Sequence, residues 1–240
     1  MNQRECVIEV MRANGGYATL GQLYMQTPVK DWKTKTPFAT IRRIVQDGRF
    51  FSRIKPGLWA LKDFKGELPA GSLPDEKKAA LKNEFNHTYY QGLLVELGNL
   101  RNFETFVPYQ DKNRLFLGKP LNEITALSKI YDFSFINIVN NAKTVDVTWF
   151  NSRHMPSMFF EVEHSTPMKN SLLKFLELQD FNSRFHIVAP SAREKEFNAK
   201  MESDVFRPIK SRTKFFEYEG LSQLHSKESE LAALRQGMGL

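Results

Sequence analysis

The amino-acid sequence predicts an α+β protein made of two parts: a small domain of helices and one hairpin, followed by a larger α/β core with a mixed sheet. Two observations carry this prediction. In the first sixty or so residues, apolar side chains recur at helical spacing in three segments and then alternate in two short ones. Beyond about residue 80, alternating strand-like segments are interleaved with amphipathic helix-like segments.

The first domain is expected to span residues 1–64. Helices are predicted near 6–13, 19–27 and 37–48, each bounded by glycine, proline or a capping threonine. Two alternating segments joined by a Lys-Pro-Gly turn follow as a hairpin over 50–62. Three helices followed by a hairpin is the order of a winged helix, in which the third helix enters the major groove of DNA.

The positive charge of the chain is concentrated in this first part. Residues 1–74 hold 12 Lys/Arg and 6 Asp/Glu, an excess of +6, whereas the rest of the chain has an excess of only +1. Nucleic acid is the commonest partner of a small, locally basic domain, although a solvated basic surface is the alternative. We expect DNA contacts from the third helix, the segment before it and the hairpin, at Lys33, Lys35, Arg42, Arg43, Arg53 and Lys55.

Two segments of the first domain, TPFATIRRIVQDG and the closing GLWAL, resemble the HARE-HTH class of winged-helix domains. The resemblance covers roughly the first quarter of the chain. It implies an association with DNA-acting proteins, restriction endonucleases among them. A winged helix used for protein contacts is the alternative function.

A linker is expected at residues 65–80, which contain two prolines and two glycines, and the second domain at 81–240. Its order is a long helix, strands, a helix, a strand, a helix and a final strand. Two neighbouring strands carry acidic residues among apolar ones: TVDVTWF contains Asp146, and SMFFEVEHS contains Glu161 and Glu163.

The spacing of these three carboxylates predicts a cation site. Side chains alternate faces along a strand, so Glu161 and Glu163 point the same way, and antiparallel pairing would bring Asp146 to Glu161. Burying three carboxylates together is costly unless a cation compensates them. Carboxylate oxygens are the ligands that Mg²⁺ prefers.

Asp146 and the segment Glu161-Val162-Glu163, followed by a helix, resemble the motif of the PD-(D/E)XK nuclease superfamily, the fold of many restriction endonucleases. The resemblance covers roughly residues 85–220. It implies that Asp146 and Glu161 bind Mg²⁺, for which Mn²⁺ can substitute, with the Val162 carbonyl as a further ligand. Glu163 would then activate the attacking water.

Glu96, on the first helix of this core, matches an acidic position that often contributes to such metal sites. Lys169, on the helix after Glu163, would supply a cation for the transition state. The chain departs from the superfamily pattern at Glu163, where lysine is usual. Some restriction enzymes of the superfamily have glutamate there, so this departure does not exclude activity.

These features together predict a magnesium-dependent DNA endonuclease of the type II restriction or phage-defence kind. Its partner would be double-stranded DNA, and a homodimer is expected because cutting both strands needs two sites. The alternative is a non-catalytic DNA-binding regulator with a degenerate nuclease-like domain. The charge distribution also allows an RNA-directed enzyme.

Cysteine content and hydropathy indicate the compartment. The sequence has one cysteine, lacks a signal-peptide-like run at its start, and has no apolar stretch long enough to span a bilayer. We therefore expect a cytoplasmic protein without a membrane partner.

Overall fold

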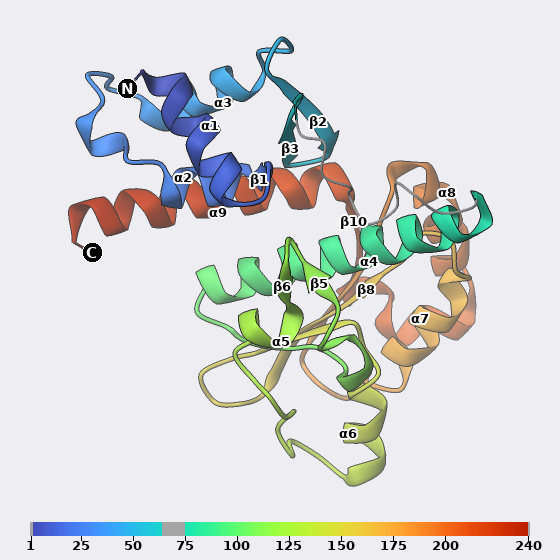
Figure 1. Cartoon of the computed structure of the whole chain (residues 1–240). Coiled ribbons are helices and arrows are strands. Elements are labelled where there is room, and N and C mark those ends of the chain that lie inside the picture. The colour runs from blue at the N-terminus through green and yellow to red at the C-terminus, as the bar shows by residue number, and fades with distance from the viewer. Residues whose placement is uncertain (1, 64–74, 240) are drawn as a thin grey trace. The chain divides into compact units, whose positions relative to one another are not determined.

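In the computed structural model of the chain, residues 2–63 and 75–239 are described, the side chains of 75–83 excepted (Figure 1). They fall into two compact units, Met1–Gly71 with Ser222–Leu240, and Ser72–Leu221. The α+β class predicted from the sequence is confirmed, since both units combine helices with a sheet. Residues 65–74 of the expected linker lie outside the described residues, and 75–80 begin a long helix.

The first unit contains the helices and hairpin in the predicted order. Its elements are α1 (Gln3–Ala13), β1 (Tyr17–Thr19), α2 (Leu20–Gln26), η1 (Val29–Asp31), α3 (Pro37–Val45), β2 (Phe51–Lys55) and β3 (Leu58–Leu61). The strands form an antiparallel sheet in the order β1-β3-β2. Capping boxes at Asn2 and Thr19 begin α1 and α2, because each side chain accepts a hydrogen bond from the third residue of its helix. Pro37 occupies the first position of α3.

A long C-terminal helix, α9 (Tyr218–Met238), was not predicted from the sequence. The expected second domain ran to residue 240, but from Ser222 onward the chain belongs to the first unit. Here Ser222 donates a hydrogen bond to the Pro56 carbonyl at 3.0 Å. The predicted third helix also ends at Val45 rather than Gly48, and β1 is a further strand that the sequence did not reveal.

The second unit is built around a five-stranded mixed sheet in the order β10-β9-β8-β7-β4. The chain passes through α4 (Asp75–Leu100), β4 (Glu104–Phe106), η2 (Tyr109–Asp111), β5 (Leu115–Phe116), β6 (Lys119–Pro120), α5 (Leu121–Ile124), α6 (Ile136–Ala142), β7 (Val147–Phe150), β8 (Pro156–Val162), α7 (Met168–Leu176), β9 (Arg184–Ala189), η3 (Ser191–Arg193), α8 (Glu194–Met201), η4 (Asp204–Arg212) and β10 (Thr213–Glu217). Neighbours β4, β7 and β8 pair antiparallel, whereas β8, β9 and β10 pair parallel.

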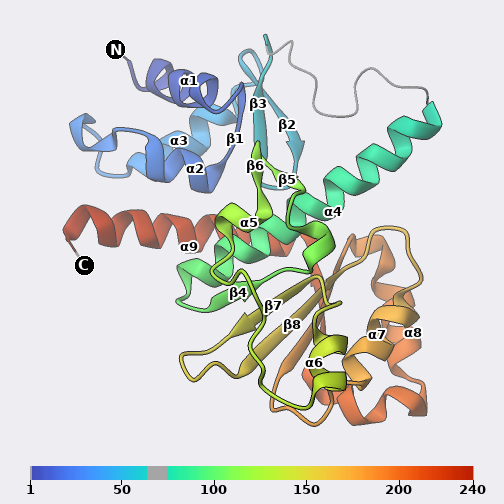
Figure 2. The same ribbon diagram turned by 60° about the horizontal axis from the view of Figure 1, so that its bottom comes forward.

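Helices cover both faces of this sheet, with α4 on one face and α7 and α8 on the other (Figure 2). On the α4 side, the Trp149 indole donates to the Leu94 carbonyl at 3.1 Å, and its ring packs against Phe160. On the other side, Phe159 and Phe185 join a buried cluster with α7 and α8. Alternate residues of β8 therefore face opposite layers, which places Glu161 toward α7.

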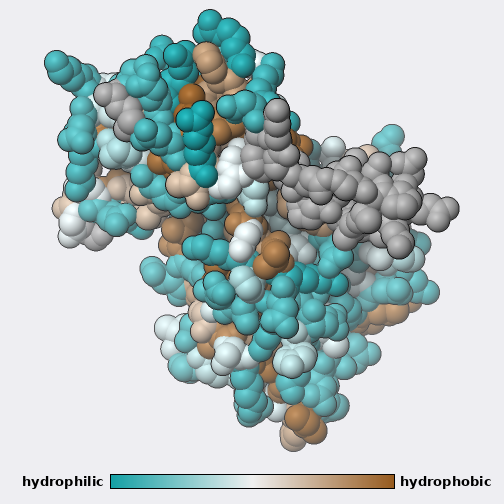
Figure 3. Space-filling model, in the orientation of Figure 1, coloured by the Kyte–Doolittle hydropathy of each residue, from teal (hydrophilic) through white to brown (hydrophobic). Residues whose placement is uncertain are grey.

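The surface of the face shown in Figure 3 is largely hydrophilic, with an apolar patch over α6 at the foot of the view. Exposed Phe135 and Ile136 begin that helix. Among the described residues, no helix is both long and apolar enough to cross a membrane.

Candidate active site

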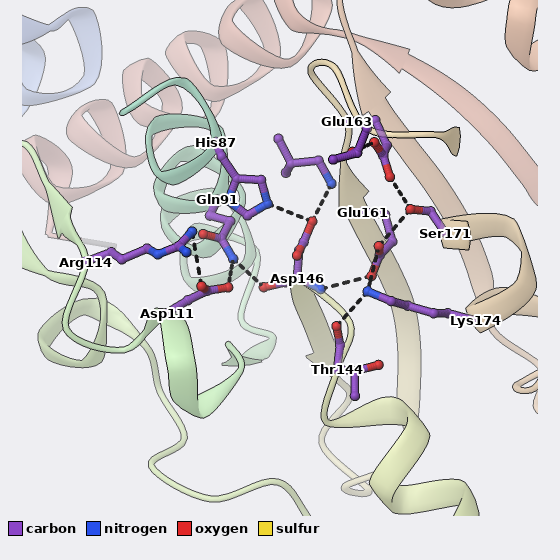
Figure 4. A network of polar contacts seen from close by, with 12 residues as sticks. His87, Gln91, Asp111, Arg114, Thr144, Asp146, Glu161, Glu163, Ser171 and Lys174 are labelled. Carbon is purple, nitrogen blue, oxygen red and sulfur yellow. Dashed lines mark hydrogen bonds and ion pairs between the residues drawn. The ribbon is translucent and has the colours of Figure 1, made fainter. Parts of the chain in front are cut away.

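Asp146 and Glu161 meet where β7 begins and β8 ends (Figure 4). The antiparallel register pairs Val147 with Phe160, so the residue before β7 lies beside the end of β8. The Val162 amide donates to Asp146 Oδ2 at 2.7 Å, and the Asp146 amide donates to Glu161 Oε1 at 3.3 Å. This is the approach that the alternation of the two strands predicted.

Glu161 is a buried acid, with 3% of its surface exposed. Lys174 Nζ lies 2.8 Å from Glu161 Oε1 and 2.9 Å from Oε2, and it also donates to the Thr144 carbonyl at 2.9 Å. Burial and the neighbouring charge of Asp146 raise the pKa of Glu161 to about 8, against the opposing effect of Lys174. A cation at this position would relieve the repulsion between the two acids.

The cation that the structure brings to the acidic pair is Lys174. Residues three apart lie on one face of a helix, so Ser171 and Lys174 of α7 both reach Glu161. Lys169, which was predicted from the sequence to be the cation of the site, is exposed on α7. It lies about 200° around the helix from Ser171, at about 100° per residue.

Glu163 continues past the end of β8 and faces α7 in the same direction as Glu161. Its amide donates to the Val188 carbonyl at 2.8 Å. Ser171 and Thr166 are hydrogen-bonded to its two carboxylate oxygens, and Arg193 Nη1 lies 3.6 Å from Oε2. Both oxygens of Glu163 are therefore engaged by neighbouring side chains.

Ser171 links the two glutamates. Its Oγ lies 2.9 Å from Glu161 Oε2 and also contacts Glu163 Oε1. A hydroxyl has one proton to donate, so it can serve only one carboxylate at a time. A proton on Glu161 satisfies the other contact, and the raised pKa of Glu161 favours that proton.

His87 and Gln91 of α4 approach the site from the opposite face of the sheet. His87 Nε2 lies 3.0 Å from Asp146 Oδ2. Burial disfavours protonation of His87, but the hydrogen bond and charge of Asp146 leave its pKa raised above the ordinary value. Gln91 Nε2 donates to the Asp146 carbonyl at 3.1 Å and to buried Asp111 at 2.9 Å.

His87 and Gln91 were not predicted as site residues, although both lie on α4, a helix that the sequence predicts. Their four-residue spacing places them on one face of α4, but nothing local says that this face meets Asp146. Glu96, the residue predicted from this helix, is half-buried and lies five residues beyond Gln91. That separation turns it about 140° around the helix from Gln91.

The donors at the acidic pair suit a hard divalent cation. Within residues 2–63 and 75–239, no group of three or more His, Cys, Asp or Glu side chains gathers to hold a metal ion. The candidate set is smaller: the carboxylates of Asp146 and Glu161, with the Val162 carbonyl. Mg²⁺ is commonly bound by one or two carboxylates and completed by water, so the donor chemistry fits.

The basic residues predicted to contact DNA have different environments in the first unit. Arg42 is committed within the unit: its guanidinium lies 2.7 Å from Glu230 of α9 and donates to the Tyr24 hydroxyl at 3.2 Å. The side chain of Lys55 is half-buried. The others are exposed, namely Lys33, Lys35, Arg43 and Arg53.

The fold and the paired acids define a two-unit α+β protein with a buried acidic site on a mixed sheet. Residues 67–238 match the family described as the type II restriction enzyme NmeDI C-terminal domain. Because this match covers more than half of the sequence, the chain belongs to that family. The family supports a restriction-enzyme-like domain, whereas the HARE-HTH and PD-(D/E)XK resemblances stay predictions.

A curated relative is the type II restriction enzyme NmeDI of Neisseria meningitidis serogroup C, which is 26% identical over 151 residues. The aligned region covers 58% of this chain and 42% of the relative, so the chain spans less than half of the relative's length. No solved structure matches the chain.

Proposed function

We propose that this protein is a magnesium-dependent endonuclease of the type II restriction kind, which hydrolyses phosphodiester bonds in double-stranded DNA. The observation that carries the proposal is the meeting of Asp146 and Glu161 at the junction of β7 and β8, with Lys174 on Glu161. Membership of the NmeDI C-terminal domain family supports the same reaction class.

Asp146, Glu161 and the Val162 carbonyl would hold Mg²⁺, or Mn²⁺ in its place. Such an ion lowers the pKa of bound water and stabilises charge on a phosphate. The amide of Val162 fixes the carboxylate of Asp146 through its 2.7 Å hydrogen bond, and His87 contacts the same oxygen at 3.0 Å. Asp146 is therefore held in place by β8 on one side and α4 on the other.

The superfamily pattern has a catalytic lysine at the position of Glu163. In this protein Lys174 would supply that positive charge. Its ammonium lies against Glu161 and is only partly exposed, so it can face negative charge that develops on the phosphate in a site of low dielectric. Glu163 is a positioning residue in this mechanism. It fixes Ser171, which in turn contacts Glu161.

The first unit would bring the enzyme to DNA as a winged helix. Phosphates or base edges would be contacted by exposed basic side chains, namely those of Lys33, Lys35, Arg43 and Arg53. Arg42 contributes to the unit's own packing through Glu230. A homodimer would place two acidic sites on the two strands of a symmetric target.

A second candidate function is a non-catalytic DNA-binding regulator. The observation that favours it is the engagement of both Glu163 oxygens by Ser171 and Thr166, at the position where the superfamily usually has lysine. In this alternative Lys174 stabilises the fold as the partner of a buried acid, without acting on phosphate.

A cleavage assay on plasmid and phage DNA, both modified and unmodified, with and without Mg²⁺, separates the two functions. Asp146→Asn and Lys174→Met should each lower the cleavage rate by about 100-fold or more, the scale of losing one electrostatic contributor to a transition state. Lys169→Met, on the same helix but exposed, is the matched control and should stay within about two-fold of the wild type. Absence of Mg²⁺-dependent cleavage by the wild type on every DNA would overturn the nuclease proposal.

A further inference from the structure

A pocket lies in the same unit as the acidic pair. It encloses about 380 Å³, within the ~300–1,000 Å³ typical of small-ligand pockets. Buried Phe106 of β4 and buried Ile130 provide its apolar lining, and Tyr109 and Gln110 of η2 line it as well. The mechanism proposed above uses none of these residues.

The charged side chains that line this pocket are all lysines: Lys112, Lys129 and Lys143. Lys112 donates to the Ser128 carbonyl, and Lys143 donates to Asn140 Oδ1 at 3.0 Å, so both of these contacts are to oxygens that carry no formal charge. Lys129 pairs with Asp132 at 3.4 Å, but both side chains are exposed, and such surface pairs are weak. The pocket is therefore suited to a negatively charged ligand.

Tyr109 presents a large aromatic ring to solvent beside these lysines, with 86% of its surface exposed. Lys112 Nζ lies 5.6 Å from the Tyr109 ring centroid and 5.9 Å from that of Phe106. A single exposed aromatic residue is ordinary on a protein surface. Together with the lysines, however, it forms the combination that binds single-stranded nucleic acid: a ring on which a base stacks, and cations for the phosphates.

Thr144 links the lining of the pocket to the acidic site. This residue lines the pocket and lies two positions before Asp146. Its carbonyl accepts the hydrogen bond from Lys174 at 2.9 Å, and Lys174 in turn contacts Glu161 (Figure 4). A strand of DNA whose phosphate reached the acidic pair would therefore have neighbouring nucleotides close to the pocket.

We propose that this pocket binds an unpaired nucleotide of the DNA strand next to the bond that is cut, with the base stacked on Tyr109 and its phosphates near Lys112, Lys129 and Lys143. This inference rests on the proposed nuclease function. Taking a base out of a duplex costs a few kcal/mol, so the pocket would act most readily on a distorted or single-stranded end. Stacking accepts any base, and the pocket would therefore tune binding without reading sequence.

Photocrosslinking in EDTA tests the pocket without requiring cleavage. The probe is a short single-stranded oligonucleotide containing 5-iododeoxyuridine, which crosslinks on irradiation to aromatic side chains that stack on it. The full-length chain should crosslink at Tyr109, in the tryptic peptide covering residues 102–112. Tyr109→Ala should lower the affinity for the same oligonucleotide, measured without irradiation, by about 5- to 150-fold, the range that follows from stacking of ~1–3 kcal/mol per base.

Two further variants make the result specific. Tyr109→Phe keeps the ring and should retain the affinity of the complex within about two-fold. Leu115→Ala, at an exposed apolar residue outside the pocket lining, should have no effect on the crosslink. Crosslinks only outside residues 102–112, no binding of the oligonucleotide, or unchanged affinity in Tyr109→Ala would each overturn the proposal.

The outcomes also separate this inference from the nuclease function. If the wild type cleaves DNA with Mg²⁺ but does not crosslink at Tyr109, the nucleotide-binding pocket is contradicted and the nuclease function is supported. If the wild type crosslinks at Tyr109 but never cleaves DNA, the nucleotide-binding pocket is supported and the nuclease function is contradicted.

Discussion

Replacement of Glu161 by glutamine should raise the stability of the metal-free protein while abolishing cleavage. Glutamine has nearly the shape of glutamate. Its one oxygen can accept from Lys174, which lies 2.8 Å from Oε1, and its amide group can donate to Ser171 Oγ, which lies 2.9 Å from Oε2. What the substitution removes is a buried negative charge beside Asp146. A buried charge that lowers stability is typical of a residue that serves binding or catalysis.

The magnitude follows from the pKa of Glu161, which rises from 4.5 to about 8 on folding. One pKa unit corresponds to about 1.4 kcal/mol, so the folded protein loses up to about 4 to 5 kcal/mol when this group is charged. Because the folded state binds the proton more tightly, the wild type should lose stability as pH rises from 4.5 to 8. The pKa of about 8 already includes the favourable effect of Lys174. Weaker hydrogen bonds from the neutral amide offset part of the gain, and we expect a net increase of about 1 to 3 kcal/mol at pH above 8.

Urea unfolding in EDTA, at a pH below 6 and again above 8, measures this effect. Glu217→Gln, at an exposed glutamate at the end of β10, is the matched control and should change the free energy of unfolding by less than about 0.5 kcal/mol. Adding Mg²⁺ should stabilise the wild type by mass action and should leave Glu161→Gln nearly unaffected.

The reasoning would be refuted by a Glu161→Gln variant that is less stable than the wild type at pH above 8. It would also be refuted by a pH dependence of stability that is identical in the two proteins. Either result would mean that Glu161 carries its charge at no cost in the folded state, stabilised by Lys174 alone.

Three further substitutions test other parts of the molecule. Arg42→Ala should lower stability by about 1 kcal/mol with little change in DNA affinity, because its partly exposed ion pair with Glu230 is lost. Arg43→Ala should instead weaken DNA binding and reduce its salt dependence. Urea unfolding measures the stability and fluorescence anisotropy the DNA affinity of both variants, and the reverse pattern would contradict the assignment. The pKa of His186 is lowered to about 4 by burial, so the unfolded chain takes up the proton first and stability should fall by up to about 3 kcal/mol between pH 6.5 and 4. His186→Phe, which can keep the ring contact with Phe160, should flatten that slope in a pH series of unfolding curves, and an unchanged slope would assign it to other groups.

Local sequence patterns account for most of the elements of the fold. Capping residues, Pro37 and the Lys-Pro-Gly turn mark the helices and hairpin of the first unit because they act on the backbone within a few residues. The alternation along β7 and β8 likewise placed Asp146 beside Glu161, since a strand has only two faces.

Helix α9 was not predicted from the sequence, and the reason lies in how it packs. Beyond Leu221, the buried positions of α9 are Ser222, His225 and Ser229, so the part of the helix in the first unit buries polar residues and lacks a buried apolar stripe. Gly21 allows this close packing, because a Cβ there would come within 2.6 Å of the Ser229 hydroxyl and 2.8 Å of the His225 ring. Such a helix packs by close steric fit and not by an apolar face, so its sequence gives no periodic signal and only the folded unit shows it.

The sequence by itself determined the class of the fold, its two acidic strands and the pairing of Asp146 with Glu161, because each depends on short-range backbone geometry. Only the tertiary structure decided which cation meets them. Lys169 and Lys174 are both lysines of α7, and the rotation of that helix against the sheet turns Lys174 inward and leaves Lys169 in solvent. His87 approaches Asp146 across 59 positions of the chain, a distance over which no local pattern specifies which helix face will pack.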